Sequence, residues 1–213
     1  MENEFKKASG ISLLIGSLLL VATMVLHPSG GDIEHILRIK TVIIVSHSLA
    51  ILSLPFIGFG FWGISVNLTT KSRVSLLAFM IAAFGLIAAM VAATINGLTL
   101  PLFISEVANQ DFDANTIHLI NAYGRYINIP MDYILILSFG LAISIWSVLM
   151  VKGVNFPKWM GYYGLVLMVA GLVALLNQFN FAGLFGFRVF IFGIVSWVIA
   201  VGIKILLPVK EKI

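Results

Sequence analysis

The chain has 213 residues, of which 60% are hydrophobic and only 10% are charged, and its mean hydropathy is +1.07. Soluble domains are about 45–50% apolar and about 25% charged, so this composition excludes a water-soluble globular protein. On the same grounds it excludes a disordered chain, a collagen, a coiled coil and a nucleic-acid-binding domain. The sequence predicts a polytopic membrane protein whose surface contacts the lipid bilayer and which has no nucleic-acid partner.

Cysteine is absent from the chain. This absence excludes disulfides, iron–sulfur clusters, covalently attached haem, thiolate zinc sites and cysteine nucleophiles. The formal net charge of +4 would suit an anionic partner. In a membrane protein, however, an excess of Lys and Arg in the cytoplasmic loops is the simpler explanation.

Six continuous apolar runs are each long enough for a bilayer-spanning helix, which needs about 20 residues. They predict spans near residues 9–27, 41–66, 74–104, 130–151, 158–177 and 187–207. The runs lack the polar–apolar alternation of a β-barrel. The expected fold is therefore an all-α bundle of six transmembrane helices, forming a single domain over residues 1–213. We expect Pro101 to bend or end the long third span.

The distribution of basic residues predicts the orientation in the membrane. With six spans, both termini share one side with nine of the 13 basic residues, namely Lys6, Lys7, Lys71, Arg73, Lys152, Lys158, Lys204, Lys210 and Lys212. By the positive-inside rule that side is cytoplasmic, so both termini are expected in the cytoplasm. Near this side Trp62, Trp146 and Trp159 are expected to anchor the chain at the membrane boundary.

Two segments on the outer side are predicted to be helical without spanning the membrane. Asp32 is a candidate N-cap for a helix that runs straight into the second span. Residues 114–128 have helical apolar spacing and predict a short interfacial helix, capped by Asp113 or Asn115. Pro130 is expected to separate this interfacial helix from the fourth span.

All four histidines lie toward the outer side. His47 lies inside the second span, about 9 Å along the helix from its outer end at 1.5 Å per residue, His27 closes the first span, and His118 lies on the interfacial helix. His47 with His27 or His118 would supply the two imidazoles that a haem b or a metal ion needs. The alternative is that His47 bonds a neighbouring helix and the others are boundary residues. No H-x-x-x-H or H-E-x-x-H motif is present.

Asp132 follows Pro130 at the outer end of the fourth span. A carboxylate within a membrane costs a few kcal/mol, which makes Asp132 a candidate for taking up a proton, binding a cation or pairing with Arg125 or Arg188. The alternative interpretation is helix capping, because an acidic residue in the first turn after a proline interacts favourably with the helix dipole.

Further polar residues of the outer half extend this candidate site. Asn96 and Gly97, followed by Pro101, predict a locally broken helix, which a membrane tolerates where the backbone is buried or lines a cavity. Asn177 lies at the outer end of the fifth span. The sequence therefore predicts an outward-facing polar pocket with the candidate residues His47, Asn96, His118, Arg125, Asp132 and Asn177.

The chain has no catalytic motif. Neither G-x-S-x-G nor a phosphate-binding P-loop occurs, so no catalytic residue is predicted and the chain is not expected to be an enzyme. Gly60 and Gly164 belong to small-residue faces that permit close helix contact. Such faces suit packing within the chain, a second copy or a membrane-protein partner.

The stretch from Asn155 to Leu165 reads NFPKWMGYYGL. It resembles a P-[RK]-W-x-x-x-x-G-L element that opens late helices in small, uncharacterised bacterial multi-pass proteins, of the kind described as domains of unknown function. The resemblance covers only this stretch and carries no catalytic residue. It implies a six-helix protein of the bacterial inner membrane.

These features give three functional hypotheses. The first is a membrane protein that binds a small molecule or a lipid in the outward-facing pocket, without catalysis. The second is a haem- or metal-binding redox protein that uses His47 with His27 or His118. The third is an accessory subunit of a membrane complex.

Overall fold

A computed structural model describes residues 2–69, 72–107, 110, 113–153 and 155–207, and these are 89% helical. The helical elements are α1 (Glu2–Leu26), α2 (Ile33–Thr69), α3 (Val74–Ala92), the π-helical segment η1 (Ala93–Thr99), α4 (Leu100–Val107), α5 (Ala114–Lys152), α6 (Lys158–Leu176) and α7 (Leu184–Leu206). Because α3, η1 and α4 are continuous, the described chain contains six long helices, each apolar enough to cross a membrane. The predicted all-α fold with six spans is confirmed.

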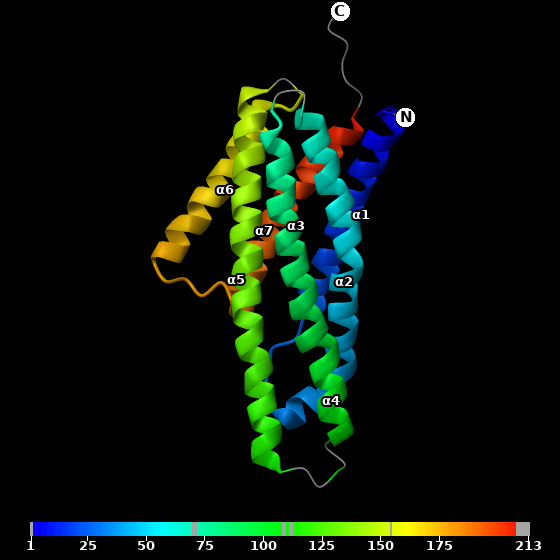
Figure 1. Cartoon of the computed structure of the whole chain (residues 1–213), viewed down its shortest axis with the longest axis vertical. Coiled ribbons are helices and arrows are strands. Elements are labelled where there is room, and N and C mark those ends of the chain that lie inside the picture. Colours follow the sequence, from blue (N-terminus) through cyan, green and yellow to red (C-terminus); the bar gives the residue numbers. More distant parts are fainter. Residues whose placement is uncertain (1, 70–71, 108–109, 111–112, 154, 208–213) are drawn as a thin grey trace, which may run out of the picture.

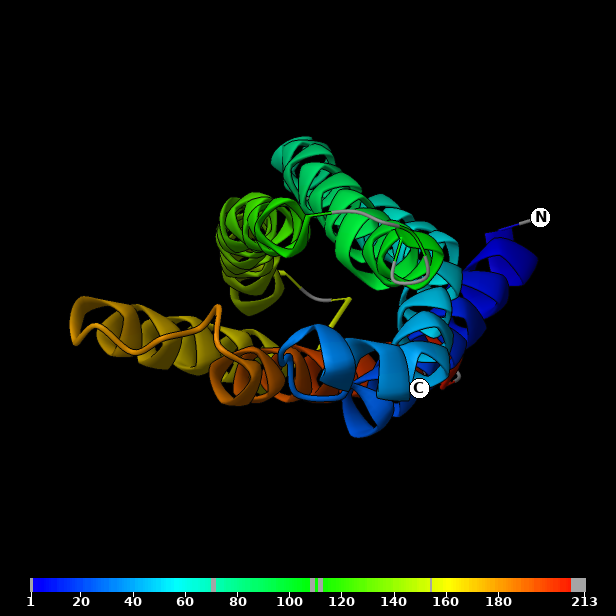
Figure 2. The ribbon, with the colours of Figure 1, turned by 90° about the horizontal axis from the view of Figure 1, so that it is seen from below.

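The six long helices form a closed ring, which Figure 2 shows end-on. In ring order they are α1, α2, α3, α5, α6 and α7, and α7 packs back against α1. The α6–α7 contact is the least extensive of these, and α6 leans outward from the bundle along its length (Figure 1). Helix α1 begins and helix α7 ends at the same end of the ring, which we call the terminal end. The opposite end is called the histidine end, because His27 follows the end of α1 there, and His35 and His118 lie near the starts of α2 and α5.

Large side chains fill the centre of the ring toward the terminal end. Trp146, Trp197 and Phe61 are fully buried, and the two indole rings stack with their centroids 6.4 Å apart. The indole N–H of Trp146 donates to Ser65 Oγ (2.9 Å), and that of Trp197 donates to the Met160 carbonyl (3.1 Å). Both buried donors are therefore satisfied, and these contacts join α2, α5, α6 and α7.

The three tryptophans expected at the membrane boundary do not behave alike. Trp62 and Trp159 are 40% and 55% exposed, as boundary residues would be. Trp146 instead faces the centre of the ring. Its prediction as a boundary anchor is wrong because depth along a helix does not determine which face of the helix carries the side chain.

Glycines allow the backbones of neighbouring helices to approach closely. A Cβ atom at Gly60 would overlap Leu13 of α1, and one at Gly63 would overlap Ser9 of the same helix. At Gly161 of α6, a Cβ atom would lie 2.5 Å from the Ser147 carbonyl oxygen of α5. These small-residue faces are therefore occupied by helices of the same chain.

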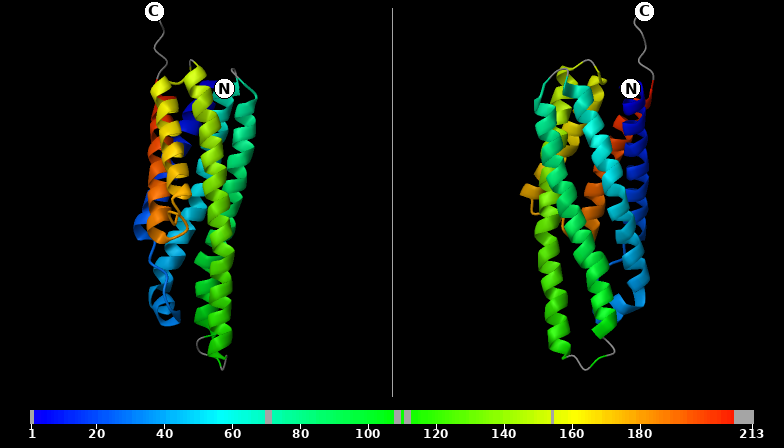
Figure 3. Two further views of the ribbon diagram at one scale, coloured as in Figure 1. Left: turned by 90° about the vertical axis from the view of Figure 1, so that its left-hand side faces the viewer. Right: turned by 45° about the vertical axis from the view of Figure 1, so that its right-hand side comes forward.

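Three of the long helices project beyond the others at the histidine end (Figures 1 and 3). Helices α2 and α5 have 37 and 39 residues, whereas α1, α6 and α7 have 25, 19 and 23. At 1.5 Å per residue these lengths are about 55–60 Å and about 30–40 Å. A bilayer core is about 30 Å thick, so α2, α4 and α5 extend past it. A small apolar core of Ile36, Ile104, Val107 and Ile117 packs their projecting ends together.

We expected Pro101 and Pro130 to interrupt or end helices, but both lie inside continuous helical segments. Residues 114–128 are helical, but they are the first part of α5, which continues through Pro130 to Lys152. The predicted separate interfacial helix is therefore wrong, because membrane helices accommodate proline when other groups satisfy the freed backbone. Pro101 likewise does not end the third span. The wider π turns of η1 immediately precede it, and the helix continues as α4 to Val107.

The predicted helix starts are confirmed by their capping contacts. Asp32 Oδ1 accepts a hydrogen bond from the His35 backbone N–H (2.8 Å), and α2 then runs without a break into the membrane. Asp113 Oδ2 accepts from the Thr116 backbone N–H (3.1 Å) at the start of α5. Side-chain oxygens at these positions satisfy donors that a helix N-terminus leaves free.

Candidate functional site

Two histidines meet where α1 ends. The ring centroids of His27 and His47 lie 4.8 Å apart, with the ring planes inclined at 54°. Gly97 of η1 lies directly against His47, because a Cβ atom at Gly97 would overlap Cβ and Cγ of that histidine. His118 is exposed near the start of α5. Of the two pairings considered from the sequence, the structure brings His47 against His27.

Hydrogen bonds define the tautomer of both rings. His27 Nδ1 lies 3.0 Å from the Pro28 carbonyl oxygen, and His47 Nδ1 lies 2.8 Å from the Ile43 carbonyl oxygen. A carbonyl oxygen only accepts, so each Nδ1 carries a proton and donates it. Each neutral ring therefore keeps a lone pair on Nε2.

A chain of amides leads to a buried carboxylate on the other side of η1. Asn96 Nδ2 donates to Asn128 Oδ1 (3.0 Å), and Asn128 Nδ2 donates to Asp132 Oδ2 (2.6 Å). Asp132 is only 7% exposed. Because α5 begins at Ala114, Asp132 lies deep inside the helix and does not cap it. The capping interpretation of Asp132 is therefore wrong.

The π-helical segment leaves a backbone acceptor beside this chain. The Leu100 N–H donates to the Ile95 carbonyl, five residues back. Pro101 has no N–H, so the Asn96 carbonyl lacks the donor that the same pattern would supply. Gly124 of α5 lies opposite, where a Cβ atom would be 3.1 Å from Asn96 Oδ1. The side-chain amide of Asn96 therefore lies against α5.

Arg188 of α7 binds the end of α1. Its Nε donates to the Met24 carbonyl (3.1 Å) and its Nη2 to the His27 carbonyl (2.6 Å). Carbonyls at a helix C-terminus have no partners within the helix, and a positive charge interacts favourably with that end. Neither predicted arginine partner of Asp132 is found in that role, since Arg188 binds α1 and Arg125 is exposed.

We predict that Arg188→Leu lowers the free energy of unfolding by about 1.5–3 kcal/mol, because two charge-assisted hydrogen bonds to the end of α1 are lost. Unfolding of the purified protein in mixed micelles measures this change. Arg125→Leu is the matched control, and we expect it to stay within about 0.5 kcal/mol of the wild type, as is usual for exposed positions. Equal effects of the two substitutions would refute the capping role of Arg188.

The remaining predicted pocket residues lie elsewhere. His118 and Arg125 are exposed on the projecting end of α5, and Asn177 is exposed at the end of α6, where its Nδ2 donates to the Val173 carbonyl (2.7 Å). The structure therefore brings together two pairs of the residues singled out from the sequence: His27 contacts His47, and Asn96 is linked to Asp132. It adds Asn128, which the sequence analysis missed although it lies four residues, about one helical turn, before Asp132.

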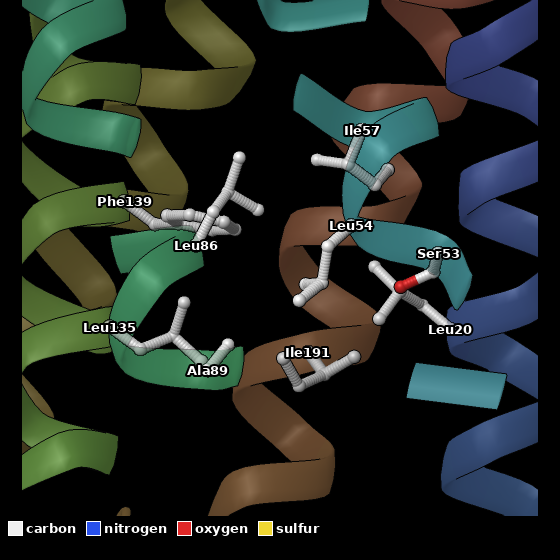
Figure 4. A pocket seen from close by; sticks show the side chains of 9 residues that line it. All are labelled: Leu20, Ser53, Leu54, Ile57, Leu86, Ala89, Leu135, Phe139 and Ile191. Atoms are coloured by element: carbon white, nitrogen blue, oxygen red, sulfur yellow. The ribbon is translucent and has the colours of Figure 1, made fainter. Parts of the chain in front are cut away.

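An apolar cavity lies about one helical turn deeper in the ring (Figure 4). Leu135 follows Asp132 by one turn of α5, and Ile191 follows Arg188 by one turn of α7. The lining residues are Leu20, Ser53, Leu54, Ile57, Leu86, Ala89, Leu135, Phe139 and Ile191, and the volume is about 30 Å³. At about 10–15 Å³ for each water-sized probe, this volume suits a small group and not a lipid chain.

No family model, no curated protein and no solved structure matches the chain. The class of protein therefore follows from its own fold. Its six long apolar helices are those of a multi-pass membrane protein.

Proposed function

We propose that the protein binds a small molecule through a cationic group at Asp132, reached from the histidine end. The observation that carries this proposal is the setting of the carboxylate. Asp132 is 7% exposed, and its hydrogen-bond donor is the neutral amide of Asn128. Among the residues that the structure describes, no Lys, Arg or His lies within ion-pair distance of it.

The energetic argument favours a positively charged occupant. A carboxylate within a membrane costs a few kcal/mol, and one hydrogen bond from a neutral amide offsets only about 0.5–1.5 kcal/mol of that. An ammonium group or a small cation would supply the missing countercharge. The carboxylate oxygens of Asp132 have lone pairs beyond the one that accepts from Asn128, and these would accept its N–H groups or enter its coordination shell.

The surroundings favour a small solute over a lipid. The adjoining apolar cavity of about 30 Å³ has no space for an acyl chain. The proposed route of access is from the projecting ends of α2, α4 and α5, because these ends carry exposed polar side chains such as Glu34 and His118. With both termini cytoplasmic, as the basic residues predict, this site would open to the outside of the cell membrane.

A melting experiment tests the proposal. The purified full-length protein is unfolded by heat in sodium, ammonium or ethanolamine chloride, with N-methylglucamine chloride at equal ionic strength as the reference. We expect at least one of these probes to raise the melting temperature, because a ligand at 100 times its Kd adds about 2.7 kcal/mol. Asp132→Asn should abolish this increase.

Asp113→Asn is the matched control, since it changes an exposed carboxylate at the start of the same helix to an amide that still caps it. We expect its response to each probe to equal that of the wild type. Without any probe, Asp132→Asn should melt no lower than the wild type, because the substitution removes a buried charge. A wild type that responds to no probe, or an Asp132→Asn variant that responds equally, contradicts the proposal.

The accessory-subunit hypothesis receives less support. Its basis was a set of glycine faces for a partner, but Gly60, Gly63 and Gly161 contact helices of the same chain. A homo-oligomer or a membrane-protein partner would therefore use other faces of the helices.

A further inference from the structure

A surface groove lies between α3 and α5 at the terminal end, where these two helices run side by side (Figure 1). Its lining comes from residues around the start of α3 and from the last turns of α5, namely Ser72, Val74, Ser144, Ile145, Val148 and Leu149. The volume of the groove is about 320 Å³, about ten times that of the central cavity. Val74 and Val148 are exposed, so the groove opens on the outside of the bundle, where lipid surrounds a spanning helix.

The groove suits a hydrocarbon chain better than a polar solute. Ser144 Oγ donates to the Gly140 carbonyl of its own helix (2.7 Å), and Ser72 Oγ accepts from the Val74 backbone N–H (3.2 Å). The two hydroxyl groups are therefore already hydrogen-bonded, and the other lining side chains are those of Val, Ile and Leu. A polar solute would give up its water for few new partners here, whereas an alkyl chain needs none.

Basic residues flank the groove on the side of the terminal end. Arg73 immediately precedes Val74, and Lys152 follows Val148 by four residues, about one turn or 6 Å along the same face of α5. Both basic side chains are exposed. The segments that join α2 to α3 and α5 to α6 contain no Asp or Glu in the sequence. The N-terminus of α3 adds the partial positive charge of its dipole, so this end of the groove favours an anion.

An anionic phospholipid has hydrocarbon chains next to a negatively charged phosphate, which matches the two parts of this surface. Basic clusters and pockets at the ends of transmembrane helices bind such headgroups. We propose that the groove holds an acyl chain of an anionic phospholipid whose headgroup binds Arg73 and Lys152. The site is independent of the cation site proposed at Asp132, which lies about 30 Å from Lys152 along α5 at 1.5 Å per residue and takes a ligand of opposite charge.

Lipid titration tests this inference. The full-length protein in a nonionic detergent is titrated with dioleoylphosphatidylglycerol, or with dioleoylphosphatidylcholine, which has the same chains but no net charge. Native mass spectrometry counts the lipids bound to each chain, and we expect one phosphatidylglycerol to bind more tightly than phosphatidylcholine. Arg73→Gln and Lys152→Gln should each weaken this binding about fivefold, the effect expected of one basic residue at an anionic lipid. Lys7→Gln, at an exposed position of α1 at the same end, should leave it unchanged.

A second pair of variants tests the groove itself. Ser144→Phe fills it with an aromatic ring and should weaken phosphatidylglycerol binding, whereas Val166→Phe, at an exposed position of α6, should not. If Ser144→Phe fails to fold, Ser144→Leu is the smaller substitution for the same test. Asp132→Asn should bind the lipid as the wild type does, which separates this site from the proposed cation site. The inference is overturned if the wild type binds phosphatidylglycerol no more tightly than phosphatidylcholine, if Lys7→Gln weakens binding as much as Arg73→Gln, or if filling the groove has no effect.

Discussion

Trp146→Ala is expected to lower the free energy of unfolding by about 3–5 kcal/mol, the range for removing a large aromatic side chain from a packed core. Trp146 is fully buried, stacks on Trp197 and lies 5.0 Å from the Phe61 ring centroid. Its loss leaves a cavity where α2, α5 and α7 meet, and removes the indole donor to Ser65 Oγ. Equilibrium unfolding in mixed micelles, followed by the fluorescence of the remaining tryptophans, measures the change.

Trp62→Ala is the control for that experiment, because it removes the same side chain from a position that is 40% exposed. Its effect should be clearly smaller, since much of the ring already faces outward. If the two variants lost equal stability, the centre of the ring would not be the main packing core of the protein.

Gly97→Ala is expected to lower the free energy of unfolding by about 1–3 kcal/mol, the usual cost of overpacking a well-filled interior. The added Cβ atom would overlap His47 Cβ and Cγ, which lie close to the α2 backbone and move little. The ring must therefore shift or the helices must separate. The matched control is Gly171→Ala, at a position where the new Cβ atom meets nothing within 4 Å. That variant should equal or slightly exceed the wild type, because alanine is the better helix former.

A double-mutant cycle locates the cause of the Gly97→Ala effect. In a His47→Ala background the added methyl group has space, so Gly97→Ala should cost much less there. Residues in contact commonly show coupling energies of 0.5–3 kcal/mol. Additive effects of the two substitutions would mean that the contact between η1 and His47 does not control the packing of α2 against η1.

The spans were predictable because a bilayer imposes a simple rule. Backbone groups in lipid must be bonded within the segment, so long apolar runs become helices, and the six runs did so. Which face of each helix points toward the centre of the ring was harder to predict from the sequence. Trp146 and Trp62 lie at similar predicted depths, yet one is at the centre of the ring and the other is exposed. Hydropathy that is high all round a helix contains little information about which face packs.

The candidate site was predictable in part. His47, Asn96 and Asp132 were singled out because polar side chains are rare within spans. Asn128 was missed for a physical reason. Ending a helix at Pro130 placed Asn128 and Asp132 on separate elements, whereas the continuous α5 makes them neighbours one turn apart. The choice of His27 as the partner of His47 depended on where α1 ends relative to α2, a relation that no local pattern contains.

The π segment also shifts the phase of the third transmembrane helix. Along α3 the inward stripe is Ser75, Ala78, Ala82, Gly85, Ala88 and Ala92, with steps of three and four residues. After Ala92 the stripe moves on by a single residue and continues as Ala93, Gly97, Pro101, Ile104 and Val107. In an uninterrupted α-helix each residue advances by about 100°, so the inward line would have run on through residues 95–96 and 99. The wide turn therefore acts as a register change within one span: it turns glycine toward His47 of α2, and leaves Asn96 to reach across to α5.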